Sequence, residues 1–161
     1  MLRRALAVVV AASGMAFGAA PAWADKPTKQ PLPSSEFTVT GIGCGFDVKV
    51  TPLENKEVTH TFSDGRVEIT GTFKVRLTNV ETGKSIVVNI SGPAALTPNG
   101  DGTFTAVLKG RSLIFPNAPP EATTLFFVNS GRTIMIVNES LTHWTLLNFM
   151  GMQFDVCKAL G

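Results

Sequence analysis

The chain has 161 residues, of which 14 are basic, 12 are acidic, 11 are phenylalanine and 2 are cysteine. Two of the basic residues lie within residues 1–24, so the remaining 137 residues carry 12 charges of each sign. A neutral chain without a basic cluster argues against nucleic acid or an anionic membrane surface as a partner. Its length suits a single domain with a hydrophobic core.

Residues 1–24 have the three parts of a secretory signal peptide. Arg3 and Arg4 are positively charged, residues 5–12 are apolar, and residues 22–24 form a small-x-small cleavage sequence. The apolar run is too short to span a membrane. We therefore expect a bacterial chain that is cleaved after Ala24 and secreted, and that does not insert into a membrane afterwards.

The residues after the expected cleavage point divide into two parts. Residues 25–35 contain three prolines and no apolar period, which predicts a flexible tether. Residues 36–161 form the predicted single domain. Its first strands are expected at residues 36–40, 46–51 and 57–62, and Pro52 is expected to end the second of them.

Residues 66–91 give the clearest hairpin signal. Apolar and polar residues alternate on both sides of a turn at residues 80–84, and Gly83 can adopt the positive φ that a short hairpin loop needs. Gly71 is expected to mark a kink before this hairpin. The residues expected on its apolar face are Phe73, Val75, Leu77, Ile86, Val88 and Ile90.

Further strands are predicted after a Gly-Pro pair and a turn at residues 98–102. They are expected at residues 103–109, 111–115, 124–128, 133–137 and 143–156. Residues 129–132 are expected to join two of these strands as a hairpin, both faces of which are apolar enough to be covered. Residues 155–160 could instead form a short helical turn.

About ten short strands with turns between them predict an all-β domain. We expect a single antiparallel β-barrel of about 8–10 strands, because closure removes exposed sheet edges. A β-sandwich is the alternative.

Cys44 and Cys157 are the two cysteines of the chain. Because export would place them in an oxidising compartment, we expect a disulfide between them. The alternative is a reactive or metal-binding thiol, which would need a nearby base or further ligands.

His60 is the weak catalytic candidate, since it lies between Val58 and Phe62 on a face that the alternation predicts to be apolar. The alternative is a partly buried histidine with one hydrogen bond, because one ionisable residue does not make a catalytic set. His143 is expected at the surface. Asp47 and Asp155 flank the cysteines, but a strand register that pairs the cysteines would point the two carboxylates to opposite faces.

No metal or cofactor site is expected. Residues 99–102 form a Gly-rich turn without the further acidic ligands of a calcium loop. Met135, Met150 and Met152 have no accompanying Cys or His cluster that would bind copper. The sequence also lacks the nucleophile-elbow, phosphate-loop and zinc-protease motifs.

The middle of the chain resembles small secreted bacterial all-β proteins that have no assigned function. The matching residues are 44–48, 77–79, 82–84, 89–93 and Cys157. The resemblance implies an exported β domain and supplies no activity and no catalytic residues.

Three functions remain open. The first, which we favour, is a secreted non-catalytic binding or cell-surface-associated domain, whose partner is a small apolar ligand in a cavity or another protein or surface. The second is a cofactor-free barrel enzyme of the isomerase or cyclase type, which predicts a cavity that contains His60 with a carboxylate or hydroxyl. The third is a secreted protease inhibitor that presents residues 116–122 as a rigid loop.

Overall fold

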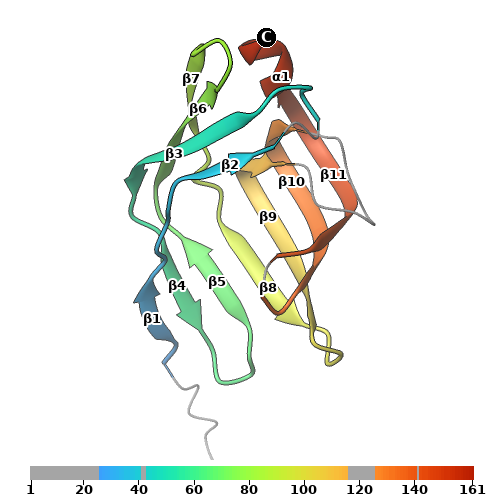
Figure 1. The fold of residues 1–161 in the computed structure, drawn as a ribbon. Coiled ribbons are helices and arrows are strands. Elements are labelled where there is room, and N and C mark those ends of the chain that lie inside the picture. The colour runs from blue at the N-terminus through green and yellow to red at the C-terminus, as the bar shows by residue number, and fades with distance from the viewer. Residues whose placement is uncertain (1–25, 41–42, 116–125, 141) are drawn as a thin grey trace, which may run out of the picture.

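The computed structural model describes residues 26–40, 43–115, 126–140 and 142–161, which form eleven β-strands and one short helix (Figure 1). Every pair of neighbouring strands is antiparallel. The predicted all-β class is therefore confirmed, and one helical turn closes the chain.

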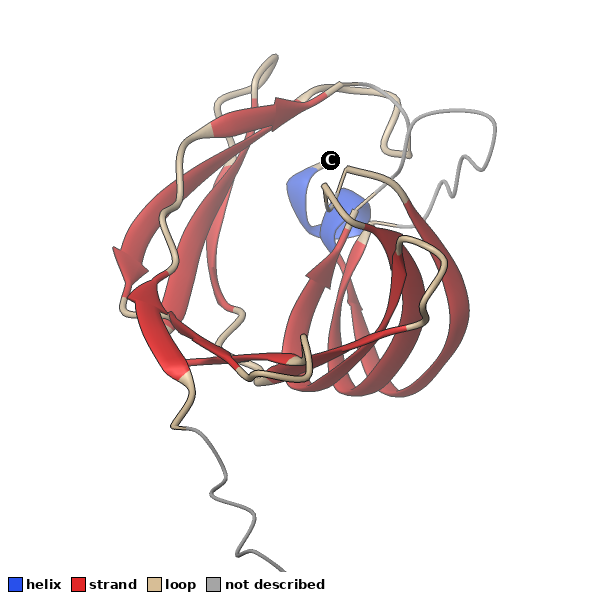
Figure 2. Cartoon of the chain, turned by 90° about the horizontal axis from the view of Figure 1, so that it is seen from below, coloured by secondary structure: helices blue, strands red, loops and turns tan. Residues whose placement is uncertain are grey.

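The strands form two sheets. In spatial order, the seven-stranded sheet contains β1 (Thr28–Pro31), β4 (Val58–Thr61), β5 (Val67–Thr70), β8 (Ala94–Pro98), β9 (Thr103–Ile114), β10 (Phe127–Asn138) and β11 (Trp144–Asp155). The four-stranded sheet contains β2 (Phe37–Val39), β3 (Val48–Asn55), β6 (Phe73–Asn79) and β7 (Ser85–Asn89). Viewed from below, the sheets curve toward each other around a common interior (Figure 2).

Within the described residues, the chain passes from one sheet to the other four times: between β1 and β2, between β3 and β4, between β5 and β6, and between β7 and β8. The last three of these crossing segments are hydrogen-bonded to their neighbours by Lys56 N–H to Thr72 O (2.8 Å), Ile90 N–H to Phe73 O (2.9 Å) and Gly92 N–H to Arg111 O (2.8 Å). The hydrogen bonds of the described residues do not close into a barrel, since each sheet keeps two edge strands.

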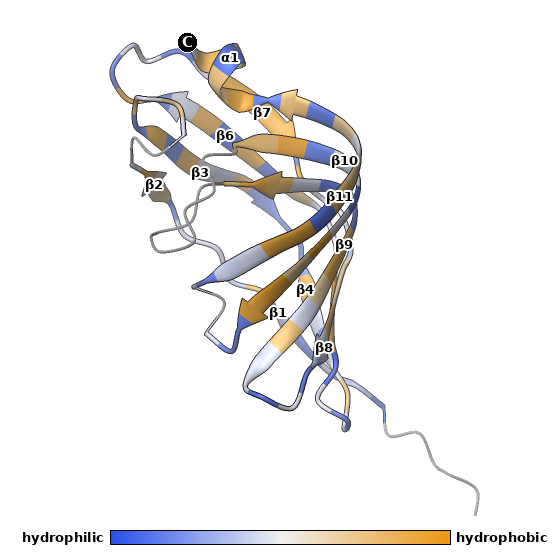
Figure 3. Cartoon of the chain, turned by 90° about the vertical axis from the view of Figure 1, so that its right-hand side faces the viewer, coloured by the Kyte–Doolittle hydropathy of each residue, from blue (hydrophilic) through white to orange (hydrophobic). Residues whose placement is uncertain are grey.

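β9 and β10 each run for twelve residues, so the predicted break at Gly110 and the predicted hairpin turn at residues 129–132 are wrong. Gly131 of β10 pairs with Gly110 of β9 on one side and with Gly151 of β11 on the other. A Cβ atom on Gly131 would collide with the carbonyl oxygen of Met150. β9 and β10 continue through this row of glycines instead of ending there, and Figure 3 shows β9, β10 and β11 as curved strands.

Two prolines do not have the effect that the sequence predicted. Pro52 lies within β3 and pairs with Val75, and a register shift follows it before Glu54. A bulge of this kind tolerates a residue that has no N–H to donate. The segment 25–35, expected to be a tether, contains β1, which ends at Pro31 and pairs with β4 at the edge of its sheet. An edge strand can accommodate a proline.

The predicted hairpin is confirmed as β6 and β7. Val75 pairs with Val88 and Leu77 with Ile86, and Gly83 has a φ of 73° in the turn. The Oδ1 atom of Asn79 accepts hydrogen bonds from the next turn residues, Glu81 N–H (2.9 Å) and Thr82 N–H (3.2 Å). The alternation of apolar residues therefore located both the strands and their buried face.

The core has two clusters of buried residues. The first joins the four-stranded sheet to β10 and to α1 (Val156–Leu160), and its buried members are Val48, Val50, Val75, Leu77, Phe126, Val128, Val156 and Leu160. The second lies within the curve of the seven-stranded sheet, and its buried members are Leu96, Ala106, Ile114, Phe127, Met135 and Val137. Because Phe127 and Val128 are consecutive and belong to different clusters, the start of β10 is covered on both faces, as predicted for these two residues.

Candidate functional site

A cavity of about 280 Å³ lies between the two sheets, beside the crossing segments. Ten of the twelve residues around it are apolar or glycine, and the two polar ones are Glu57 and Ser112. The apolar and glycine residues are Phe37, Val50, Pro52, Phe73, Val75, Ile90, Gly92, Leu108, Leu113 and Phe115. Cavities of this composition typically hold small ligands that bury most of their surface in apolar contacts.

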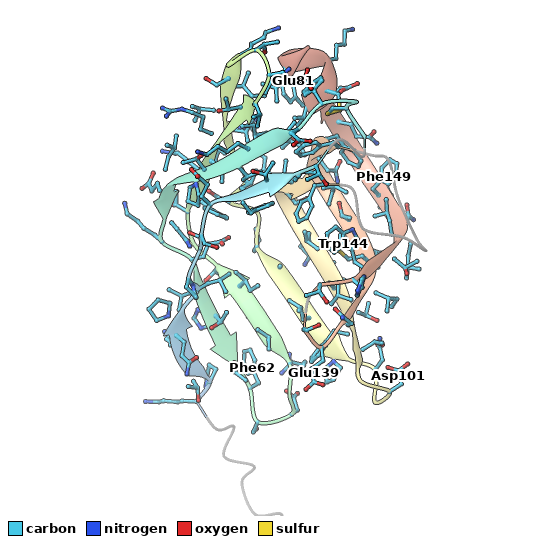
Figure 4. The ribbon with its side chains drawn as sticks, viewed as in Figure 1. Phe62, Glu81, Asp101, Glu139, Trp144 and Phe149 are labelled. Atoms are coloured by element: carbon cyan, nitrogen blue, oxygen red, sulfur yellow. A yellow bond between two sulfur atoms is a disulfide. The ribbon has the colours of Figure 1, made fainter. Side chains whose placement is uncertain are left out.

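A second cavity of about 100 Å³ adjoins the first, because Leu108, Leu113 and Phe115 line both. The Phe115 ring lies 5.6 Å from the Phe37 ring of β2 and 4.8 Å from the ring of Trp144, which begins β11 and is labelled in Figure 4. These three aromatic side chains connect an edge strand of one sheet with an edge strand of the other. They therefore link the two sheets on a side where no strand-to-strand hydrogen bonds join them.

Glu57 lies at the crossing between β3 and β4, and its backbone is fixed on both sides. Its N–H donates to Asn55 Oδ1 (2.9 Å) and its carbonyl oxygen accepts from the N–H of Leu32 (2.9 Å). Asn55 is itself held, because its Nδ2 donates to the carbonyl oxygen of Leu32 (2.7 Å). The segment that follows β1 therefore positions Glu57 in the cavity wall.

Burial raises the pKa of the Glu57 carboxyl, because the apolar surroundings disfavour its charged form. Glu54, three residues earlier, has the opposite environment. Hydrogen bonds from Lys56 (2.7 Å) and Lys74 (2.9 Å) lower the pKa of Glu54 to about 2. The two carboxyl groups thus lie on the same short segment and differ in whether a cation accompanies them.

A buried polar pair lies next to the cavity on β9 and β10. Ser112, which lines the cavity, is the cross-strand partner of Asn129, whose side chain is fully buried. The Nδ2 atom of Asn129 donates to Thr133 Oγ1 (2.9 Å) and to Met150 O (3.3 Å). Its Oδ1 is the buried side-chain atom that lacks a hydrogen-bond partner in the described part of the chain.

His60 does not line either cavity. It pairs with Glu68 of β5. The preceding residue, Thr59, lies on the opposite face of β4 and pairs with Ile69, which packs against the second core cluster. The His60 ring lies 3.3 Å from Thr70 Oγ1. The structure therefore shows a partly buried histidine with one hydrogen bond on the outer face of the sheet, and it places the apolar interior on the other side of β4.

His143 and Asp155, two other residues singled out from the sequence, also lie away from both cavities. His143 is exposed at the loop before β11, where its N–H donates to Asn138 Oδ1 (3.0 Å). Asp155 caps α1 by accepting from the N–H of Lys158 (2.9 Å). The loop 116–122, proposed as an inhibitor loop, lies outside the described residues.

The predicted disulfide between Cys44 and Cys157 is present. Cys157 lies in α1 and Cys44 in the turn before β3. The strand-to-strand register that would place Asp47 and Asp155 on opposite faces therefore does not occur. The bond fastens α1 to the four-stranded sheet, beside the first core cluster.

Within residues 26–40, 43–115, 126–140 and 142–161, no group of three or more His, Cys, Asp or Glu side chains could hold a metal ion. The turn at residues 99–102 satisfies its own polar groups, since Asp101 accepts from the N–H of Thr103 (2.9 Å). In the same described ranges, no helix has the length and apolar character needed to span a membrane.

Sequence reasoning missed Glu57 and Ser112. Glu57 begins the predicted third strand, and the sequence alone does not distinguish a charged residue that lines a cavity from one that is exposed to solvent. Ser112 lies on β9, which the sequence analysis had divided into two strands at Gly110. Comparisons of the chain with protein-family models, curated proteins and solved structures found no match.

Proposed function

We propose that this protein is an exported, non-catalytic binding domain that takes a small, mainly apolar ligand into the cavity between its two sheets. The observation that carries the proposal is the cavity of about 280 Å³ and its predominantly apolar lining. The signal-like residues 1–24 and the disulfide support an oxidising destination outside the cytoplasm. The architecture that we propose is a partly open barrel, supported by the hydrogen-bonded crossings and by the aromatic contacts between β2 and β11.

The cavity limits the size of the ligand. An apolar cavity of about 150 Å³ in another protein binds benzene, which has six carbon atoms. A cavity of about 280 Å³ therefore suits a ligand of about ten non-hydrogen atoms. The adjoining space behind Phe115 could extend the site if that side chain changed its rotamer.

The test is calorimetric titration of the purified protein with 1-octanol and with 2-naphthol, one flexible and one rigid ligand of this size. Two variants fill the cavity from different walls: Leu108→Trp from β9 and Ile90→Trp from the segment between β7 and β8. Leu53→Trp is the control, since Leu53 is 45% exposed and does not line the cavity. Circular dichroism shows which variants fold.

We expect at least one of the two ligands to bind the unmodified protein and the Leu53→Trp variant with equal affinity. We expect a folded cavity-filling variant to bind about tenfold more weakly or not at all, because the added indole occupies the space of the ligand. Absence of binding to the folded protein by both ligands overturns the proposal. Unchanged binding by the cavity-filling variants overturns it as well.

A further inference from the structure

Glu57 is the one charged residue that lines the larger cavity, and its carboxyl group has no counter-ion among the described residues. In that part of the chain, no side chain or backbone N–H donates a hydrogen bond to this carboxyl group. An ionised group in apolar surroundings is unfavourable unless it is paired. The carboxyl groups of Glu36, Glu54, Asp64 and Asp101 all have partners, and those partners lower their pKa values.

The nearest cations in the sequence already have another partner. Lys56 is adjacent to Glu57, yet its Nζ lies 2.7 Å from Glu54 Oε1. Lys74 Nζ lies 2.9 Å from the other carboxylate oxygen of Glu54. Glu54 thus holds both cations outside the cavity and leaves Glu57 unpaired within it.

The position of Glu57 is also a built feature of the fold. Three hydrogen bonds hold the backbone of residues 56 and 57: Glu57 N–H donates to the side-chain Oδ1 of Asn55, Leu32 N–H donates to Glu57 O, and Lys56 N–H donates to Thr72 O. Gly71 packs directly against the same segment, leaving no room for a Cβ. A carboxyl group carried by a backbone segment that is fixed at the wall of an apolar cavity is an arrangement that can select a ligand with a complementary polar group.

We propose that the ligand of this cavity is an apolar amine, whose protonated nitrogen pairs with the Glu57 carboxylate while its hydrocarbon part fills the apolar space. This inference rests on the proposed function and specifies the ligand class for the same cavity. An ammonium group has three donors, so it can pair with Glu57 and also donate to the hydroxyl of Ser112 or to water. An acidic ligand would instead place a second negative charge beside Glu57.

The experiment compares three straight-chain ligands of eight carbon atoms: octylamine, 1-octanol and octanoate. Each is titrated at pH 7 into the unmodified protein, the Glu57→Gln variant and the Glu68→Gln variant. Glu68→Gln is the matched control, because it removes one negative charge from the outer face of β5, opposite His60. Urea unfolding of each variant verifies that it is folded.

We expect octylamine to bind the unmodified protein about ten- to a hundredfold more tightly than 1-octanol, the usual range for a hydrogen bond to a charged group. Octanoate should bind more weakly than 1-octanol. In Glu57→Gln the preference for the amine should fall to about equal binding with the alcohol, while Glu68→Gln should retain it.

The outcomes separate the two proposals. If 1-octanol binds and octylamine binds no more tightly, the amine inference fails and the apolar binding function remains. If octanoate binds most tightly, or if Glu57→Gln keeps the full preference for the amine, the inference fails as well. If none of the three ligands binds a folded protein, the amine inference fails, and the titration with 2-naphthol decides whether the proposed function fails with it.

Discussion

Gly71 lies directly against the backbone of Glu57. A Cβ atom on Gly71 would lie 2.6 Å from the Glu57 Cα and would collide with the carbonyl oxygen of Lys56. Gly71 also has a φ of 139°, which L side chains rarely adopt. The kink between β5 and β6 and the position of Glu57 in the cavity wall therefore depend on the same missing side chain.

We predict that Gly71→Ala will lower the free energy of unfolding by about 2–4 kcal/mol, which combines backbone strain with an overpacked contact. Urea unfolding followed by circular dichroism measures this change. The matched control is Gly83→Ala in the β6–β7 turn. Gly83 has a φ of 73°, and a Cβ added there would have nothing within 4 Å, so strain alone should lower its stability by about 1 kcal/mol. Equal losses in the two variants would contradict the contact between Gly71 and Glu57.

Glu54 and Glu57 should make stability depend on pH in opposite directions. The pKa of Glu54 is lowered to about 2 by Lys56 and Lys74, so its stabilisation is present above its ordinary value of 4.5 and is lost as the pH falls toward 2. The pKa of Glu57 is raised by burial, so its contribution is present below 4.5 and is lost as the pH rises through the raised value.

The measurement is the urea midpoint between pH 2 and pH 7 for the unmodified protein, Glu54→Gln and Glu57→Gln. Relative to the unmodified protein, Glu54→Gln should lose less stability on acidification below pH 4.5. Glu57→Gln should lose less stability as the pH rises above 4.5. If both variants shift the profile in the same direction, the two carboxyl groups do not have the environments described above.

Removal of the disulfide should destabilise the fold strongly. Cys44 and Cys157 are separated by 113 residues, and closing a loop of this length in the unfolded chain is worth about 4–5 kcal/mol in the chain-entropy account. We expect this loss of unfolding free energy in the variant that carries both Cys44→Ala and Cys157→Ala, measured by urea unfolding. The unmodified protein in excess reductant should unfold at a similar urea concentration. If the variant has the same free energy of unfolding as the oxidised protein, the disulfide does not constrain the unfolded chain.

The sequence predicted the local features of the fold well, because they depend on neighbouring residues. Alternation over residues 73–90 located β6, β7 and their turn. The inference that an exported chain with two cysteines forms a disulfide identified the Cys44–Cys157 bond. The prediction that both faces of the strand are covered at Val128 was correct too, because an unbroken apolar run is typical of a strand with no solvent-exposed face.

The errors came from residues whose effect depends on their neighbours in space. A glycine in the sequence can mark either a turn or a position inside a strand, and Gly110 and Gly131 lie inside strands, where they face each other across the sheet. Alternation along β4 divided its residues correctly into two faces, but it assigned the interior to the face of His60. Pairing with β5 reversed that assignment, because Thr59 lies on the same side as the partly buried Ile69, which packs against the second core cluster.

The sequence by itself determined the class of the protein: an all-β domain with one disulfide and a hairpin near its middle. Periodicity and cysteine count are properties of the chain alone, so they can be interpreted without knowing which strands pair with each other. Only the tertiary structure decided that Glu57 lines an apolar cavity while Glu54, three residues away, pairs with two lysines. The physical reason is that burial and charge pairing depend on the strands that pack against a residue, and those strands come from distant parts of the chain.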